Sequence, residues 1–263
     1  MCTDEVFKRY MALAFFLLLC IPSTTVLALD GTLDWAKRVS LSTTVTGVVS
    51  KVLVESGQQV KKGDLMIELD QRTFKSKLAK TSAGLKHAEV LLAEARLESQ
   101  RAQELYDRTL LSEHDLQMAK IGLSNAEVAL QQARAEHVQA QINAERSRIT
   151  APFDAWVLER HVELGETIVS ELNSKPILAI AEFGKMRVHA GISESELSEY
   201  TIGKMVTVTV GSNNYSGRVV SVGLELSQLY ASSGSKSKYP VWVEFDTAGK
   251  LLRAGQKAEI DLK

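Results

Sequence analysis

Hydrophobic and polar residues follow two different periods along the chain. From residue 71 to residue 147 there is no proline, and apolar residues recur every three or four positions, as on one face of an α-helix. On both sides of this stretch, apolar residues alternate with polar ones in short runs, as in strands that bury one face. The pattern predicts an α+β protein in which a long helical segment is inserted into β-structure.

Two heptad frames account for the helical segment. The first repeats at Leu78, Leu85, Leu92, Ser99 and Tyr106, and a frame offset by three holds Phe74, Thr81, Ala88, Ala95, Ala102 and Thr109. The second repeats at Leu116, Leu123, Leu130, His137 and Ala144, and its offset frame holds Ala119, Ala126, Ala133 and Ala140. A seam with mostly leucine in one frame and mostly alanine in the other lets two helices pack closely.

The two frames are out of register with each other. Seven residues after Tyr106 comes the polar Glu113, whereas the second frame begins at Leu116. This slip predicts a turn within residues 110–115, and Ser112 followed by Asp115 is typical of a helix N-cap. Residues 71–147 are therefore predicted to form an antiparallel α-helical coiled-coil hairpin with arms roughly 55 Å long at 1.5 Å per residue.

A β-motif occurs twice, once on each side of the helical segment. The stretch GVVSKVLVESGQQV begins at Gly47, and AWVLERHVELGETI begins at Ala155; they align without a gap. Gly57 and Gly165 then coincide at a tight turn, where a positive φ favours glycine. Neither copy can bury a core alone. We expect the two copies, with the strands that follow them, to pair into one sandwich.

The predicted domain boundaries follow from these patterns. The two halves of the sandwich are residues 41–70 and 148–182. Further alternating runs in residues 183–263, together with residues 33–40, predict a β-barrel domain. A tract rich in serine, glycine and lysine at residues 231–238 predicts a loop within that domain.

The N-terminal segment reads as an export signal. A basic stretch precedes an apolar run that is too short for an ordinary membrane span, and small residues follow at a suitable cleavage site. We expect residues 1–28 to be a signal peptide cleaved after Ala28; the rival interpretation is an uncleaved anchor over residues 10–29. Cys2 and Cys20 both lie in this segment, so we expect no structural disulfide in the exported chain.

Composition and charge exclude several classes of function. The chain has 31 basic and 32 acidic residues, a net charge of −1, which indicates no broad attraction to nucleic acid. Its five histidines are dispersed without metal-ligand spacing, and no phosphate-binding glycine loop is present. We therefore predict no catalytic residues, no cofactor-binding residues and no metal site, and the protein is not expected to be an enzyme.

The first copy of the β-motif carries a family pattern. It resembles the biotinyl/lipoyl domain family through Val54, Gly57, Val60, Gly63 and Leu65. In carrier members of that family, a hairpin with a modifiable Met-Lys-Met joins the two halves. Here the corresponding place reads DQRTF, from Asp70, and the helical segment follows. The lysine is missing, so the resemblance implies a split lipoyl-like domain without a lipoyl or biotinyl cofactor.

A split lipoyl-like domain with an inserted helical hairpin and a following β-barrel resembles the periplasmic adaptor, or membrane fusion protein, family (HlyD-like). In members that meet TolC-type outer-membrane channels, the hairpin tip carries an arginine, a leucine four residues later and a serine seven residues after that. Arg101, Leu105 and Ser112 have this spacing, and Ala102 is a weak match to the apolar residue that follows the arginine. The resemblance covers about residues 33–263.

The resemblance implies an elongated, non-catalytic adaptor of a tripartite efflux pump, in the periplasm and associated with the inner membrane. Its implied partners are an inner-membrane transporter, favoured as the resistance–nodulation–division (RND) type, a TolC-type channel bound through the tip, and further copies of itself as a hexamer or trimer of dimers. Larger family members also have a membrane-proximal domain, which we expect to be absent here.

Several alternatives stay open from the sequence. The transporter could be an ABC-type exporter or part of a type I secretion system. A lipoyl or biotinyl carrier shares the fold, and a purely structural coiled-coil protein would explain the helices but not the split sandwich. At the tip, the plain structural reading is that Leu105 only widens the helical seam, Arg101 is only solvated and Ser112 is only a cap.

Overall fold

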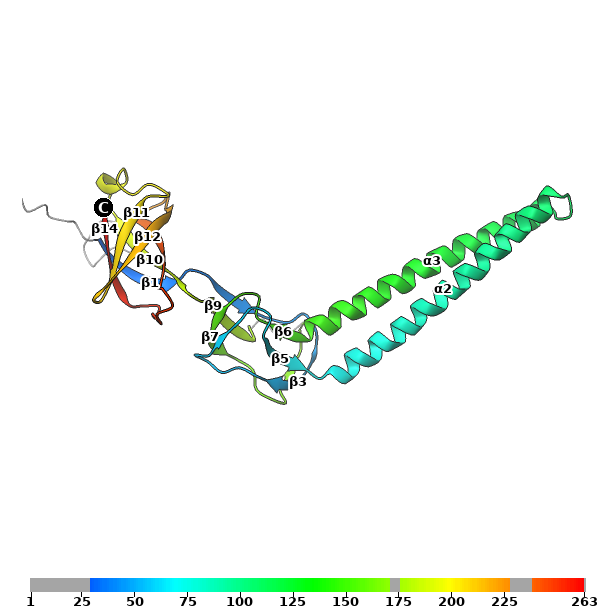
Figure 1. Cartoon of the computed structure of the whole chain (residues 1–263), viewed down its shortest axis with the longest axis horizontal. Helices are drawn as coiled ribbons and strands as arrows, with labels where there is room; N and C mark the ends of the chain where they lie inside the picture. Colours follow the sequence, from blue (N-terminus) through cyan, green and yellow to red (C-terminus); the bar gives the residue numbers. More distant parts are fainter. Residues whose placement is uncertain (1–28, 171–175, 228–237, 263) are drawn as a thin grey trace, which may run out of the picture. The chain divides into compact units, whose positions relative to one another are not determined.

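The computed structural model describes residues 29–170, 176–227 and 238–262, which form two compact units (Figure 1). The predicted signal peptide, residues 1–28, and nearly all of the predicted loop at 231–238 lie outside these ranges. One unit contains the described residues up to Ala36 and those from Gly184 onward. The other unit runs from Lys37 to Phe183.

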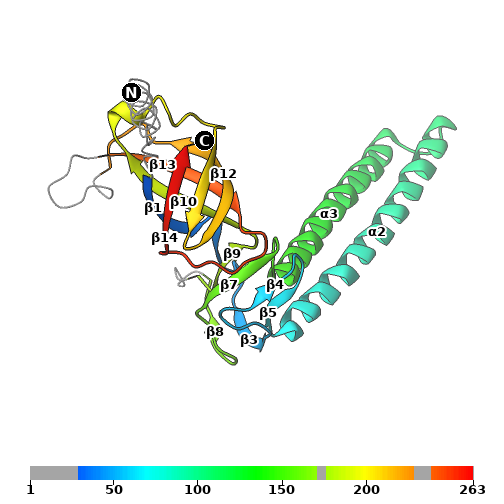
Figure 2. The ribbon, with the colours of Figure 1, turned by 60° about the vertical axis from the view of Figure 1, so that its left-hand side comes forward.

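The first unit is a closed, antiparallel six-stranded barrel (Figure 2). Around the barrel the strand order is β1-β10-β13-β12-β11-β14. The strands are β1 (Leu29–Trp35), β10 (Lys185–Ile192), β11 (Met205–Val210), β12 (Asn213–Val222), β13 (Tyr239–Asp246) and β14 (Lys257–Leu262), and a short 3-10 helix, η1 (Glu194–Glu196), follows β10.

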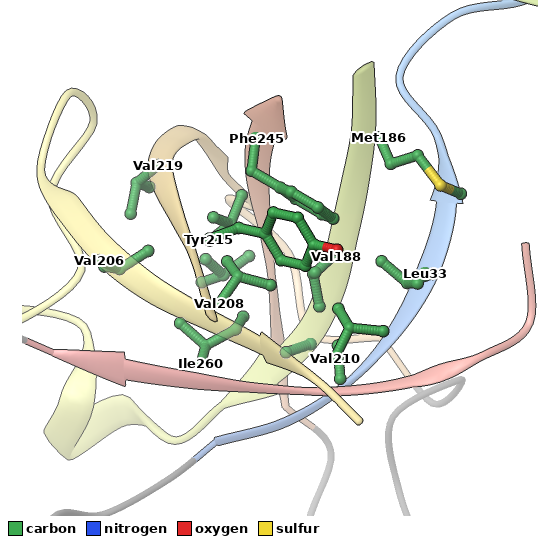
Figure 3. Packing of buried hydrophobic residues seen from close by; sticks show 14 of the residues in the cluster. Leu33, Met186, Val188, Val206, Val208, Val210, Tyr215, Val219, Phe245 and Ile260 are labelled. Carbon is green, nitrogen blue, oxygen red and sulfur yellow. The ribbon is translucent and has the colours of Figure 1, made fainter. Parts of the chain in front are cut away.

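Alternation of inward apolar residues builds the barrel core, as the sequence pattern predicts. Along β11, Val206, Val208 and Val210 are buried, while the residues between them are more exposed. Figure 3 shows these valines packed around the rings of Tyr215 and Phe245, whose centroids are 5.1 Å apart. Such inward alternation fills a small barrel with side chains and leaves no channel through it.

The predicted N-terminal boundary of the barrel needs correction. The sequence pattern predicts that residues 33–40 belong to the barrel, but β1 begins at Leu29 and ends at Trp35. The next strand, β2 (Arg38–Leu41), pairs with β9 in the other unit. The reason is burial: Val39 and Leu41 pack against the sandwich core, so this strand completes the sandwich and not the barrel.

The second unit contains two four-stranded sheets with a shared apolar core. One sheet has the order β2-β9-β7-β4 and the other β6-β5-β3-β8. Besides β2, the strands of these two sheets are β3 (Gly47–Val52), β4 (Gln59–Val60), β5 (Leu65–Leu69), β6 (Arg148–Thr150), β7 (Ala155–Arg160), β8 (Thr167–Ile168) and β9 (Leu178–Glu182).

The two copies of the repeated motif exchange strands. β4 of the first copy pairs with β7 of the second, and β8 of the second pairs with β3 of the first. The hydrogen bonds are equivalent: Gly57 N–H donates to Val157 O at 2.7 Å, and Gly165 N–H donates to Val49 O at 2.9 Å. Both glycines have positive φ, 86° and 85°, and Gly63 has φ 91°. The gapless alignment of the copies therefore matches their pairing in space.

Two long helices leave and re-enter the sandwich (Figure 1). They are α2 (Gln71–Asp107) and α3 (Glu113–Arg146), and they pack against each other as antiparallel neighbours, here called the helical pair. The residues of the predicted frames lie along their contact, with Ala88, Leu92 and Leu130 at its centre. The predicted turn at 110–115 lies slightly earlier, at residues 108–112.

No helix of the described ranges has an apolar stretch long enough to cross a membrane.

Hydrogen bonds hold the roots of both helices on the sandwich. Gln71, at the start of α2, donates from Nε2 to Ser147 Oγ at 2.8 Å, and Ser147 caps the end of α3 and is fully buried. Asp70 caps α2, and its hydrogen bonds from the side chain and backbone N–H of Arg72 lower its pKa to about 2. Thr43 Oγ1 donates to the carbonyl of Arg146 at 2.9 Å. The two helix ends are therefore tied to the same sheet and to each other.

An ion-pair cluster joins the strands on both sides of the helical insertion. The carboxylate of Glu68, on β5, accepts a hydrogen bond from Lys51 Nζ at 2.7 Å and lies 3.6 Å from Arg148 Nε on β6. Glu68 is only 8% exposed. The hydrogen bond from Lys51 is the main reason that the pKa of Glu68 is lowered, and the charge of Arg148 acts in the same direction.

We predict that Glu68→Gln lowers the free energy of unfolding by about 1 kcal/mol at neutral pH, since hydrogen bonds to charged groups are worth about 1.5–3 kcal/mol and both cations remain partly solvated. The pKa of Glu68 is lowered in the folded state, so its contribution is present above the unfolded pKa and is lost as pH falls through the folded pKa. The difference in the free energy of unfolding between wild type and Glu68→Gln should become smaller below about pH 4.

Denaturant-induced unfolding of both proteins, followed from pH 2 to pH 8, measures this difference in the free energy of unfolding. Glu159→Gln is the matched control, because its ion pairs with Arg38 and His161 are well exposed on both sides and should contribute little. A difference in the free energy of unfolding between wild type and Glu68→Gln that stays constant with pH would contradict a stabilising role for the charge of Glu68.

Candidate partner-binding site at the helix tip

Five residues, from Arg108 to Ser112, join the two helices at the tip. The turn begins with hydrogen bonds to the last turn of α2: Thr109 N–H donates to Tyr106 O at 2.8 Å, and Leu110 N–H donates to Leu105 O at 2.9 Å. Thr109 has a φ of 60°, which is unusual for a residue with a branched side chain. This single left-handed residue reverses the chain within a short distance.

Arg101 lies on the exposed surface of α2, one and a half turns before its end. Its guanidinium donates from Nη1 to Glu98 Oε2 at 2.7 Å, and the two side chains are 64% and 56% exposed. An exposed ion pair of this kind contributes little to stability. The guanidinium can therefore exchange Glu98 for a carboxylate or carbonyl of another protein at small cost, and Arg presents several donors to such acceptors.

Leu105 lies one turn beyond Arg101, so the two side chains lie on neighbouring parts of one helix face. It is half-buried, whereas Ala102 beside it is fully buried in the helical seam. One side of the Leu105 side chain therefore packs in the seam, while the other side is exposed to solvent. Leu105 thus widens the seam, as the plain structural reading expects, and still offers apolar surface to a partner.

Ser112 is the N-cap of α3. Its Oγ accepts a hydrogen bond from Asp115 N–H at 3.2 Å and donates to Asp115 Oδ2 at 2.6 Å. Glu113 and Asp115 place negative charge in the first turn, where the helix dipole favours it. The hydroxyl is exposed but already has two partners, so Ser112 mainly fixes where α3 begins.

The heptad analysis missed Leu110. Its side chain is 70% exposed, the most exposed large apolar side chain of the helical pair and its turn. The available signal was its position in TLLS, two residues before the capping serine, where a solvated turn would normally carry a polar residue. Leu110 and Leu105 together make the tip apolar at its end, next to the charged Arg101.

This arrangement suits binding to a partner. Among the described residues, no three histidine, cysteine or acidic side chains gather as metal ligands. The place of the carrier lysine is occupied by the start of α2, where Asp70 serves as the helix cap. The tip offers donors, acceptors and apolar surface on a short, well-hydrogen-bonded turn.

Comparison with known proteins agrees with this architecture. Residues 37–182 match the family model of the CzcB-like barrel-sandwich hybrid domain. The multidrug resistance protein MdtA of Proteus mirabilis is 28% identical over 219 residues, which cover 80% of this chain and 53% of MdtA. MdtA of Photorhabdus laumondii is 29% identical over 168 residues, covering 64% of this chain and 42% of that protein. The chain thus spans about half the length of these relatives.

A solved structure extends the similarity to both units. The crystal structure of a MacA–MexA chimeric protein, which contains the α-hairpin domain of Pseudomonas aeruginosa MexA, aligns with a TM-score of 0.64 and 28% identity. The alignment covers 90% of this chain and 81% of the chimera. The chain therefore belongs to the periplasmic adaptor, or membrane fusion protein, family, whose members are not enzymes, through its barrel-sandwich hybrid domain.

Proposed function

We propose that this protein is the periplasmic adaptor subunit of a tripartite efflux pump. In this role it bridges an inner-membrane transporter and a TolC-type outer-membrane channel. The observation that carries the proposal is the tip: an exposed arginine and a half-buried leucine, one turn apart, at the far end of two helices whose roots are hydrogen-bonded to the sandwich.

The relatives support the pump assignment. The matching proteins named MdtA are multidrug resistance proteins. The chimera shows that an α-hairpin domain of MexA can be placed in MacA, which is expected if the helices act as a separable recognition element. The name of the MdtA relatives favours transport of small toxic compounds over secretion of a protein, and we propose an RND-type transporter as the inner-membrane partner.

At the channel, Leu105 would fill an apolar groove between channel helices, and Arg101 would donate hydrogen bonds to acceptors at its rim. Such a contact is small and combines an apolar anchor with a charged hydrogen-bonding group, which is typical of interaction hot spots. Several copies around one channel would multiply the effect of each contact. We therefore propose a ring, a hexamer or trimer of dimers, in the periplasm at the inner membrane.

We predict that Arg101→Asp and Leu105→Asp each abolish efflux while leaving the protein folded. Arg101 makes only an exposed ion pair. At the half-buried Leu105, the loss of apolar burial should cost about 1 kcal/mol of stability, and the aspartate can turn its carboxylate to solvent, so the protein should stay folded. Thermal unfolding and drug accumulation in cells are measured side by side for each variant.

The matched controls are Arg134→Asp on α3 and Leu164→Asp in the turn between β7 and β8, an exposed arginine and an exposed leucine remote from the tip. They should melt and transport like wild type. If the tip variants melt normally and also transport normally, the tip is only a turn and the docking proposal is wrong.

A second prediction concerns the sandwich, which should carry no prosthetic group. Intact mass of the protein purified from its native host should equal the mass of the unmodified chain, allowing for cleavage of a signal peptide. An added lipoyl or biotinyl mass would instead support the carrier function.

A further inference from the structure

One end of the barrel carries most of its exposed apolar side chains. Strands β10, β12 and β14 finish at this end, next to the label C in Figure 2, and η1 lies there. Five large apolar side chains are exposed on the described part of the barrel, and four of them lie at this end. Ile202 is 71% exposed, Met205 44%, Leu224 96% and Leu226 56%. We call these four residues the exposed apolar end of the barrel.

Hydrogen bonds fix the turn that carries Ile202. Lys204 N–H donates to Thr201 O at 3.1 Å, and Gly203 N–H donates to Val219 O on β12 at 2.8 Å. Gly203 has a φ of 92°, which fits the third position of a type II turn, where glycine is favoured. Ile202 is therefore held at the corner of a well-hydrogen-bonded turn, with most of its side chain open to solvent.

The segment after β12 that carries the two exposed leucines is tied to the chain before β13 on both sides of them. Gly223 N–H donates to Pro240 O at 2.7 Å, and Ser227 N–H donates to Lys238 O at 2.8 Å. A Cβ atom at position 223 would lie 2.4 Å from Pro240 Cγ, so glycine permits this close approach. The two leucines thus follow the last strand pair of β12 and β13 on an ordered backbone, and folding gives them little burial.

The start of the chain indicates what these side chains contact. β1 begins at the same end of the barrel, because Leu29 pairs with Ile260 near the end of β14. The residues directly before Leu29 are the apolar segment whose sequence predicts an export signal or a membrane anchor. Either kind of segment enters the inner membrane while the chain is exported. We therefore expect this end of the barrel to fold next to the lipid bilayer.

Charge at this end favours neutral lipid over anionic lipid. In residues 193–204 and 223–227, together with Lys238, the charged side chains are the acidic Glu194, Glu196, Glu199 and Glu225 and the basic Lys204 and Lys238. Four acidic against two basic side chains give a net repulsion from anionic headgroups. A contact with lipid would therefore come from apolar insertion and not from charge.

We propose that Ile202, Leu224 and Leu226 insert into a lipid bilayer, at the boundary between the headgroups and the acyl chains. The η1 end of the barrel then rests on the periplasmic surface of the inner membrane. A few apolar side chains per molecule give only weak and reversible membrane binding. The inference rests on the proposed function, in which several copies form a ring, because many weak contacts on one assembly add up to stable binding. It deepens that function by naming the surface that meets the lipid.

Site-specific fluorescence tests the contact. In the full chain with Cys2→Ser and Cys20→Ala, no cysteine remains in the sequence, so Leu226→Cys gives a single labelling site. The label is a dye whose emission shifts to the blue in an apolar environment. When the protein is reconstituted with phosphatidylcholine vesicles, the dye at position 226 should shift to the blue. It should also be quenched by lipids with a nitroxide near the headgroup end of the acyl chain and be protected from iodide in the water.

Leu251→Cys is the matched control, because Leu251 is also 56% exposed but lies between β13 and β14, at the opposite end of the barrel. Its dye should stay accessible to iodide and should not be quenched by the nitroxide lipids. Adding Leu224→Glu to the Leu226→Cys chain should remove the blue shift without changing the melting temperature, since Leu224 is almost fully exposed. Replacing part of the phosphatidylcholine with phosphatidylglycerol should not increase the shift.

Three results would overturn the proposal. Equal responses of the dyes at positions 226 and 251 would show that the insertion is not specific to this end of the barrel. Protection of the dye at 226 from iodide without vesicles would show that the chain itself covers these side chains. A dye at 226 that stays in water with vesicles but is protected in native membranes would identify a protein, and not lipid, as the partner.

The failure of this inference can be told apart from failure of the proposed function. Arg101→Asp in the labelled chain should leave the dye at position 226 in the lipid while efflux is lost. If tip variants stop efflux but the dye at 226 stays in water, the adaptor function stands and the barrel does not enter the membrane.

Discussion

Strand exchange between the two copies of the β-motif is the constraint on which the rest of this unit depends. β4 completes the sheet of the second copy, and β8 completes the sheet of the first. Neither sheet can form until the chain has returned from the helical insertion. The two helices must therefore start and end at the same place, which explains why they are antiparallel and nearly equal, at 37 and 34 residues.

The same constraint positions the tip. Because the bond from Gln71 to Ser147 joins the helix roots and the packed seam continues from them, an apolar and charged turn is held far from the sandwich. Pre-ordering of this kind reduces the conformational entropy that binding would otherwise cost. The barrel is a separate unit with its own core, so a partner that binds the barrel need not disturb the sandwich.

Periodic features were predictable from the sequence, because a pattern that repeats many times can be recognised even when single positions deviate from it. The two heptad frames and the repeat that aligns Gly57 with Gly165 are of this kind, and each matches the packing. The assignment of β2 to the sandwich was missed, since four alternating residues fit either unit until their partner strand is known. Leu110 was missed because a heptad pattern identifies the residues of the seam and not those of the outer surface.

The most direct test of the account is to place a photo-crosslinking amino acid at position 105 of the full chain in cells. The account predicts a covalent adduct with an outer-membrane channel protein, identified by mass spectrometry, and no such adduct from the same probe at Val138. An adduct at 105 with no channel protein, or equal channel adducts from both positions, would contradict the claim that the tip docks on the channel.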